Sequence, residues 1–166
     1  LPVALNCVIR EATLLSRLFV LMKAKPTVAR RAVDLLLVIV ATSEDGHAAV
    51  MKAAKTHSES TGSVKFSPLI SLLTSGDVET ALSALATVNA LLGIPSRRKK
   101  VMLIRDLDAG GISEAVIPLL QIEDSRVKLQ VETYQEMTRT TLPQTERHCR
   151  ELSAKLRRAH ARVDSL

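Results

Sequence analysis

Apolar residues recur along most of the chain at the three- and four-residue spacing of one helix face, and no stretch alternates convincingly as a strand. The longest run, AVDLLLVIVAT at 32–42, contains a segment that could be a buried strand, but its pattern continues back through VARRAVD. That length favours a helix. Capping residues and Gly or Pro stops divide the pattern into separate helices. These helices are predicted at 27–42, 44–57, 67–75, 77–92, 97–109, 112–121 and 124–140, so the expected fold class is all-α.

Short polar signals set the ends of these helices. Ser67-Pro68 predicts an N-cap followed by proline at the first helical position. The polar stretch KTHSESTGS at 55–63 predicts a solvated loop, and Pro118 should shorten or kink the helix that contains it. Five further side chains are predicted to cap helix N-termini: Thr27, Ser43, Asp77, Ser96 and Asp124.

A long helix alternates with two shorter ones at a period of 47 to 50 residues. Shifting the chain by 50 residues places TVARRAVDLLLVIVATSED on DVETALSALATVNALLGIP, and a further shift of 47 brings DSRVKLQVETYQEM into the same frame. A unit of this size cannot bury its own apolar face, so successive units must stack. The pattern predicts an armadillo-like, right-handed α-solenoid over residues 1–141, with the long third helices lining its concave side.

One amide interrupts the apolar helix at 77–92. Asn89 lies where Ile39 and Glu136 occupy the equivalent places of the flanking units. An asparagine on the concave side can bond the backbone of a peptide in the groove, or it can bond a neighbouring carbonyl within the solenoid. The sequence leaves both interpretations open.

The last segment, 142–166, has a different period. Apolar and small residues recur every seven positions in two series offset by three, which is typical of a coiled-coil seam. This seam would support a homodimer, whereas the alternative is an amphipathic helix packed on the end of the solenoid. The candidates for the seam are Leu142, Cys149, Leu152, Leu156, Ala159 and Val163.

Composition limits which residues can build the core and which partners the chain can bind. Aromatic residues make up only 2% of the 166 residues, so Leu, Val, Ile and Ala must build the core. The net charge of +6, with a basic patch at Arg97, Arg98, Lys99 and Lys100, permits an anionic partner. The scarcity of aromatic residues argues against single-stranded nucleic acid, and we predict no nucleic-acid partner.

Signals for catalysis, metals and membranes are not found. No glycine-rich phosphate loop or nucleophile motif occurs, and the four His and two Cys lack metal-ligand spacing. Cys7 and Cys149, which are far apart in the sequence, are expected to be two buried thiols in a reducing compartment. The longest apolar run is about half the length that a bilayer requires, and the start LPVALNC is not a signal peptide. We therefore expect no enzyme, cofactor, metal site or transmembrane segment, and we expect the chain to be a fragment of a larger protein.

Three segments resemble a known family. The helix end LLLVIVATSED, the helix VNALL before a proline turn, and the helix KLQVETYQE are similar, in this order and spacing, to the formin homology 3 region of formins. That region is the armadillo part of the GTPase-binding and Diaphanous-inhibitory module. The resemblance covers roughly residues 5–140.

The resemblance implies a regulatory domain of an actin-assembly factor, cytoplasmic and located at the actin cytoskeleton or cell cortex. In relatives this domain holds the actin-assembling half inactive by binding an amphipathic helix near the formin's own C-terminus, and a Rho-type GTPase releases it. Actin filaments are then indirect partners. The region after the array dimerises in Diaphanous-like relatives, which suits a homodimer through 142–166. Matched onto this chain, the helix-binding groove comprises Val38, Ala41, Thr42, Leu85, Asn89 and Leu92.

The chain departs from the family pattern in two ways. The GTPase-contacting segment of relatives lies mostly upstream of the armadillo units, so we expect Rho binding to need residues upstream of these. Relatives often have acidic groove edges, whereas this chain places RRKK beside the Asn89 helix. An alternative function is therefore a basic armadillo or HEAT scaffold that localises its parent protein to membrane, actin or another partner.

Overall fold

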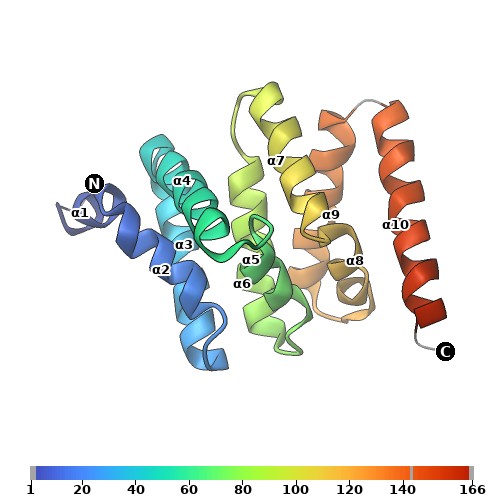
Figure 1. Ribbon diagram of the computed structural model, residues 1–166, viewed down its shortest axis with the longest axis horizontal. Coiled ribbons are helices and arrows are strands. Elements are labelled where there is room, and N and C mark those ends of the chain that lie inside the picture. The colour runs from blue at the N-terminus through green and yellow to red at the C-terminus, as the bar shows by residue number, and fades with distance from the viewer. Residues whose placement is uncertain (1–2, 143, 165–166) are drawn as a thin grey trace.

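The computed structural model describes residues 3–142 and 144–164, with the backbone only at 4–6, 12, 144–145, 147 and 163–164. Every regular element in these ranges is helical, which confirms the all-α prediction (Figure 1). The elements are α1 (Val3–Arg10), α2 (Ala12–Leu21), α3 (Pro26–Thr42), α4 (Glu44–Thr61), α5 (Ser67–Ser71), the 3₁₀ turn η1 (Leu72–Thr74), α6 (Val78–Leu92), α7 (Arg97–Ala109), α8 (Ile112–Ala115), the 3₁₀ turn η2 (Pro118–Gln121), α9 (Ser125–Thr141) and α10 (Gln144–Asp164).

The three long helices α3, α6 and α9 are successive neighbours, as predicted. Arg30 and Asp34 of α3 contact Glu79 and Ser83 of α6, at 3.5 Å and 2.7 Å, so the two helices run in the same direction. The α4 and α7 helices lie in front of them, and α10 lies at the end opposite to α1 (Figure 1). This stacking of helical layers is that of an α-solenoid.

Side-chain caps fix four of the helix starts as predicted. Ser43 accepts a hydrogen bond from the Gly46 amide at 2.9 Å, and Asp77 accepts one from the Thr80 amide at 3.0 Å. Hydrogen bonds from the Thr80 hydroxyl and amide hold the pKa of Asp77 below its usual value. Ser96 and Asp124 cap α7 and α9 in the same way, with the accepting oxygens 3.4 Å and 2.8 Å from the amides.

Three of the predicted boundaries are wrong, and two of them belong to α3 and α4. Thr27 is not a cap, because α3 begins at Pro26, and its N-cap residue, Lys25, makes no side-chain capping bond. The expected loop at 55–63 is mostly helix, because α4 continues to Thr61 and stops at Gly62, which has a φ of 66°. Its polar residues face solvent, while His57 points inward with 4% exposure. The segment is therefore an amphipathic turn of helix, which its polar composition did not reveal.

The two short helical segments are broken by local geometry. The segment predicted at 67–75 is the helix α5 followed by η1, and its N-cap residue is Phe66 rather than Ser67. In the segment predicted at 112–121, α8 ends at Ala115 and η2 begins at Pro118. This break confirms the expected effect of Pro118, since proline has no amide hydrogen to continue a helix.

The repeat register differs from the predicted one. Buried residues of α3 and α6 correspond at a spacing of 52 residues, as Ala29 with Ala81 and Leu36 with Val88 show. The predicted shift of 50 would instead equate Leu35, which is 42% exposed, with the fully buried Leu85. Burial therefore corrects the register by two residues, and this correction changes which side chains of α6 reach the surface.

Candidate partner-binding site

The exposed surface of α6 is narrow and consists mainly of small or aliphatic side chains. Since α6 is covered by α3 on one flank and α9 on the other, only one row of its side chains is partly exposed: Val78, Glu79, Leu82, Ser83, Ala86 and Ala90. Val38 of α3 is 52% exposed and Leu129 of α9 is 60% exposed. We call this surface the long-helix face.

The structure separates the predicted groove residues into two sets. Val38, Ala41 and Thr42 are exposed at the C-terminal half of α3. Leu85 and Leu92 are fully buried, so they belong to the core and cannot contact a partner in this conformation. The corrected register places Ala86 and Ala90 at the surface positions of α6 instead.

Asn89 forms contacts inside the solenoid. It is 6% exposed, and its Nδ2 donates to the Gln130 carbonyl at 2.9 Å and to the Gln130 Oε1 at 2.8 Å. These bonds tie α6 to α9, which is the second of the two interpretations that the sequence left open. The Oδ1 atom is buried and has no hydrogen-bond partner within the described residues.

A cleft of about 1130 Å³ opens where α3 and α6 end and where α4 and α7 begin. Ala41 and Thr42 of the predicted groove line it, together with Ala90 and Gly93 at the end of α6. We call it the α4–α7 cleft. Its other apolar lining comes from Val40, Ala48, Met51, Ile94, Pro95, Met102 and Leu103.

The walls of this cleft are held together by polar contacts between repeats. The His47 Nε2 lies 2.8 Å from the Leu91 carbonyl, which joins the start of α4 to the end of α6. Lys65 pairs with Asp106 at 3.0 Å in the lining itself. The cleft is therefore a formed feature of two stacked repeats rather than a gap between loose loops.

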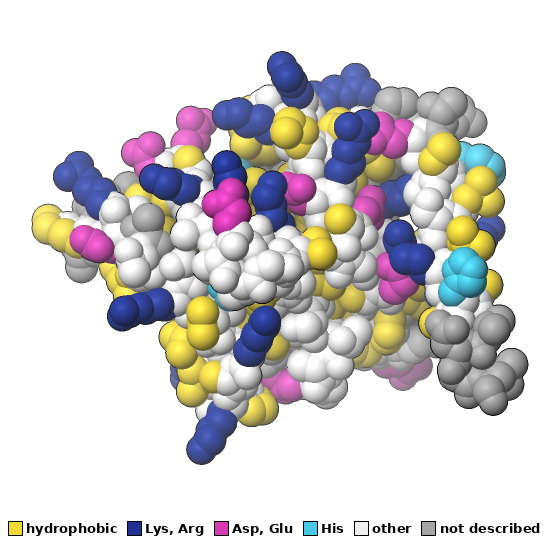
Figure 2. Space-filling view, in the orientation of Figure 1, with side chains coloured by type: hydrophobic (Ala, Val, Ile, Leu, Met, Phe, Trp, Pro, Cys, Tyr) yellow, Lys and Arg dark blue, Asp and Glu magenta, His cyan; other side chains and the backbone are white. Residues whose placement is uncertain are grey.

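The two rims of the α4–α7 cleft differ in charge. Glu44 and Asp45 lie on the α4 side, and Lys99 lies on the α7 side. Figure 2 shows basic and acidic groups beside hydrophobic ones over α4 and α7. An amphipathic segment with apolar residues on one face and charges at its edges fits such a surface.

The basic patch lies in the first turn of α7. Arg97 Nε donates to the Thr141 carbonyl at 3.4 Å, at the end of α9. The side chains of Arg98, Lys99 and Lys100 form no ion pair or hydrogen bond in the described part of the chain. Cations at a helix N-terminus are unfavourable because the helix dipole is positive there. The local structure does not compensate this cost.

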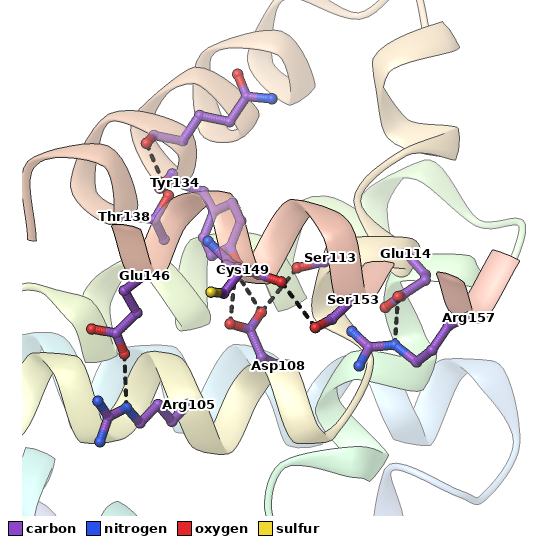
Figure 3. A network of polar contacts seen from close by, with 12 residues as sticks. Arg105, Asp108, Ser113, Glu114, Tyr134, Thr138, Glu146, Cys149, Ser153 and Arg157 are labelled. Carbon is purple, nitrogen blue, oxygen red and sulfur yellow. Dashed lines mark hydrogen bonds and ion pairs between the residues drawn. The ribbon is translucent and has the colours of Figure 1, made fainter. Parts of the chain in front are cut away.

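A polar network fixes α10 to the solenoid (Figure 3). Arg150 pairs with Asp108 of α7 at 2.7 Å, and it also donates to the Tyr134 hydroxyl of α9. Its guanidinium lies 5.6 Å from the centre of the Tyr134 ring. Two further ion pairs flank this contact, Arg105 with Glu146 and Arg157 with Glu114, each at 2.8 Å.

This network is partly shielded from solvent. Tyr134 is 3% exposed, and burial raises the pKa of its hydroxyl to about 12. The side chains of Arg150 and Asp108 are 17% and 20% exposed. Asp108 also accepts a hydrogen bond from Ser113 at 2.9 Å, so its charge is well satisfied.

The predicted dimer seam faces away from the solenoid. Leu142 is buried beside α9 and does not belong to α10. Cys149, Leu152, Leu156 and Ala159 are exposed on α10, and the side chain of Val163 lies outside the described residues. Since Cys7 is exposed as well, the expectation of two buried thiols is wrong. The packed face is instead formed by Glu146, Arg150, Ala154 and Arg157. In the single chain α10 therefore packs on the end of the solenoid through its polar face, and the described seam residues of α10 stay exposed.

No three His, Cys, Asp or Glu side chains in the described part of the chain are grouped closely enough to hold a metal ion. No described helix is both long and apolar enough to cross a membrane. The polar groups that do converge form ion pairs between helices.

Sequence comparisons identify the family. Residues 3–115, which extend from α1 through α8, match the family described as the FHOD1/3 FH3 domain. The chain belongs to the FH3 domain family of formins. It is similar to Formin-C of Dictyostelium discoideum, with 33% identity over 66% of this chain, and to Formin-G of the same organism, with 29% identity over 92% of this chain.

This result confirms the resemblance found in the sequence. The chain is therefore a regulatory protein-interaction domain of a formin. The chain spans 9% of the length of Formin-C and 15% of that of Formin-G.

The sequence pattern did not reveal several surface residues of this FH3 domain. Met51, Ile94 and Met102 come from three different segments and meet only through the stacking of repeats. Of these three, only Met102 could have been recognised as a surface residue from the sequence, because it is an apolar residue on the otherwise charged face of α7. The contact of Arg150 with Asp108 and Tyr134 joins three helices, and no local spacing predicts it.

Proposed function

We propose that this FH3 domain binds an amphipathic autoregulatory helix from the C-terminal part of its own formin. The helix would lie at the C-terminal ends of α3 and α6, across the exposed Val38 and Ala41 and into the α4–α7 cleft. Binding there would hold the actin-assembling part of the formin inactive. Actin filaments would then be an indirect partner, and the domain would act in the cytoplasm, at the actin cytoskeleton or cell cortex.

The α4–α7 cleft is the observation that supports this proposal. It offers apolar side chains, including two flexible methionines, in a cavity that no described residue fills. An exposed apolar surface rimmed by charges is typical of a site that binds another protein segment. The apolar face of an amphipathic helix would cover it, and the charged rims would orient that helix.

The test is a calorimetric titration of the FH3 domain with a peptide of the parent formin's C-terminal segment. Ala41→Asp places a carboxylate against the apolar face of the bound helix. Because Ala41 is exposed in the free domain, the variant should fold normally. Leaving a charge unpaired in the interface should cost several kcal/mol, on the order of 3 or more, and abolish measurable binding.

Ala24→Asp is the matched control, since Ala24 is also exposed but lies before the opposite end of α3. It should bind the peptide like the wild-type domain. If Ala41→Asp also binds like wild type, the cleft is not the helix site. Control by a Rho-type GTPase is part of the same proposal, and adding the GTP-bound GTPase to a longer parent fragment should release the peptide.

The unpaired cations of α7 favour a second candidate, a basic scaffold that binds an anionic membrane or filament. Arg98, Lys99 and Lys100 crowd the positive end of a helix dipole, and an anionic surface would relieve that cost. Binding of this kind should be lost above about 0.2 M salt, whereas burial in the cleft should persist, because screening weakens only the exposed charges. Cosedimentation with anionic vesicles or filaments at low and high salt separates the two candidates.

A further inference from the structure

The charged residues that attach α10 to the solenoid lie in one row along the helix. Glu146, Arg150 and Arg157 form ion pairs with α7 and α8, at 2.7 or 2.8 Å. Ser153 lies three residues after Arg150 and four before Arg157, so it occupies the same side of the helix, between the two arginines. We call these four residues the anchoring row.

The Ser153 side chain forms no hydrogen bond to another helix within the described residues. Its Oγ donates to the Cys149 carbonyl one turn earlier in α10, at 2.9 Å (Figure 3). The side chain is exposed at an open pocket of about 230 Å³, which Asp108 and the other members of the anchoring row also line. There is therefore room beside the hydroxyl for a larger group, and charged side chains would surround that group.

The attachment of α10 is largely polar. Among the described side chains of this helix, Ala154 alone is buried, with 4% exposure. A helix held by partly exposed ion pairs, with little apolar burial, opens at a low free-energy cost. The open helix would present Ser153 and the residues around it to an enzyme.

The sequence before Ser153 has a charge pattern that basophilic protein kinases select. Arg150 precedes Ser153 by three residues, the distance at which such kinases bind an arginine in an acidic subsite. The same spacing also occurs at Arg162 and Ser165, so the spacing alone does not single out Ser153. The position of Ser153 within the anchoring row does.

We infer that Ser153 is a phosphorylation site and that its phosphate releases α10 from the solenoid. A basophilic kinase would transfer the γ-phosphoryl group of ATP to the Ser153 Oγ. The bond between this phosphorus and the β-phosphate oxygen breaks, ADP leaves, and the hydroxyl proton passes to solvent. The pocket at Ser153 shares no residue with the α4–α7 cleft, so the inference does not depend on the proposed function.

The phosphate would act on the ion pairs beside it. Phosphoserine carries a charge of about −1.5 to −2 near neutral pH, and here it would lie one turn from both Arg150 and Arg157. It would compete for these arginines with their present partners, Asp108 and Glu114. Asp108 and Glu146 line the same pocket and would repel the phosphate in the docked state. Both effects favour the detached helix.

The structural effect is measured on the whole chain with phosphoserine incorporated at position 153 during translation. Hydrogen exchange of residues 144–164 should become at least about tenfold faster than in the unmodified chain, while exchange in α3 and α6 stays unchanged. Ser153→Ala should remain within about twofold of the unmodified chain, because the hydroxyl bonds only its own helix.

Lys155→Glu is the matched control for charge. It lowers the charge of α10 by about two units, as a phosphate does, but Lys155 is exposed on the side of the helix opposite to the anchoring row. Exchange of residues 144–164 should stay within about twofold of the unmodified chain, because the added charge does not face the ion pairs.

Asp108→Lys should reverse the effect of the phosphate. This variant removes the partner of Arg150, so α10 is loosened before any modification. The new lysine can then pair with the phosphate, and phosphoserine at 153 should slow the exchange of α10 in this background. A phosphate that only disrupted the helix would accelerate exchange in both backgrounds.

A kinase assay tests the site itself. The whole chain is incubated with ATP and a kinase selective for Arg three residues before Ser, and fragmentation mass spectrometry locates the phosphate on Ser153. Asp108→Asn should raise the rate of modification by at least about threefold, because it frees Arg150 and opens α10. Arg150→Ala also opens α10 but should abolish the modification, because the arginine that the kinase binds is gone.

Two results would overturn the inference. Absence of phosphate on Ser153, even in the opened Asp108→Asn variant, would show that Ser153 is not a kinase site. Exchange of residues 144–164 that is unchanged or slower with phosphoserine at 153 would show that the phosphate does not release α10.

Discussion

At the residue scale, Asn89 joins two repeats rather than presenting its amide to the surface. Asn89→Ala removes both bonds to Gln130, so α6 loses this polar contact with α9. We expect the free energy of unfolding to fall by about 1–3 kcal/mol, with peptide binding in the cleft unchanged. Urea unfolding measures the loss. Gln135→Ala, an exposed change on α9, should alter stability by less than about 0.5 kcal/mol. An unchanged stability of Asn89→Ala would contradict the structural role.

His57 makes stability depend on pH. It is 4% exposed and stacks on Phe19 at 5.8 Å, and its Nε2 has no hydrogen-bond partner among the described residues. Burial, and to a smaller extent the charge of Lys23, lowers its pKa below the usual 6.5. The unfolded chain therefore binds a proton more readily than the folded one as the pH falls below 6.5.

Stability should accordingly decrease as the pH falls from about 7.5 to about 5.5, and part of this decrease should be absent in His57→Leu. The measurement is the urea midpoint of both proteins across this range. His160→Gln, which removes an exposed histidine, should retain the wild-type slope. If His57→Leu and wild type lose stability in parallel, protonation of His57 does not contribute.

At the element scale, the attachment of α10 depends on one arginine. Arg150→Ala removes the pair with Asp108, the bond to Tyr134 and the cation–π contact together. Opening of α10 should become easier by about 1.5–3 kcal/mol, because a shielded charged hydrogen bond is lost. Hydrogen exchange should increase in residues 144–164 and the adjoining α8, but not in α3 or α6.

Arg158→Ala is the control for this experiment, since Arg158 is exposed on the same helix and forms no ion pair or hydrogen bond with the described residues of the solenoid. Its exchange pattern should match that of the wild type. A uniform increase throughout the chain after Arg150→Ala would mean that α10 is part of the global folding unit.

The helices themselves could largely be predicted from the sequence, because their caps and periods are local. Asp77 and Ser43 bond amides three residues away, so the signal and its effect lie in one turn. The polar end of α4 was missed because its inward residue, His57, is not recognisably apolar. The packed face of α10 was missed because Arg150 and Asp108 are 42 residues apart, and only the stacking of repeats brings them together.

At the scale of the whole molecule, the stacking of repeats also determined which residues of the candidate site could be predicted from the sequence. The repeat could be recognised in the sequence, but a shift of 50 residues aligns similar residues nearly as well as the true shift of 52. An error of two residues rotates the predicted surface positions by more than half a turn around the helix. Leu85 and Leu92 were therefore placed at the surface, whereas Ala41 and Thr42, near the end of α3, were correctly placed there. Burial, which depends on both neighbouring repeats, was needed to resolve the register.

Charge is the other property of the whole molecule that can be tested. Replacing Arg98, Lys99 and Lys100 with Gln lowers the net charge from +6 by three and relieves the first turn of α7. Each removed cation should stabilise the helix by about 0.3–1 kcal/mol at low ionic strength, because it opposed the dipole. Arg97 is retained because it caps α9 through the Thr141 carbonyl. Thermal unfolding should therefore occur at a higher temperature than in the wild type.

A control with the same change in net charge isolates the dipole contribution. Arg17, Lys52 and Arg158 are exposed and lie away from helix N-termini, so replacing them with Gln removes three charges without relieving a helix start. Only the α7 variant should gain the additional stability, and the difference should shrink toward zero at about 1 M salt, where the screening length is about 3 Å. A less stable α7 variant would show that these cations support the fold. A more stable one would mean that the chain retains an unfavourable basic turn, as expected if that turn binds an anionic partner.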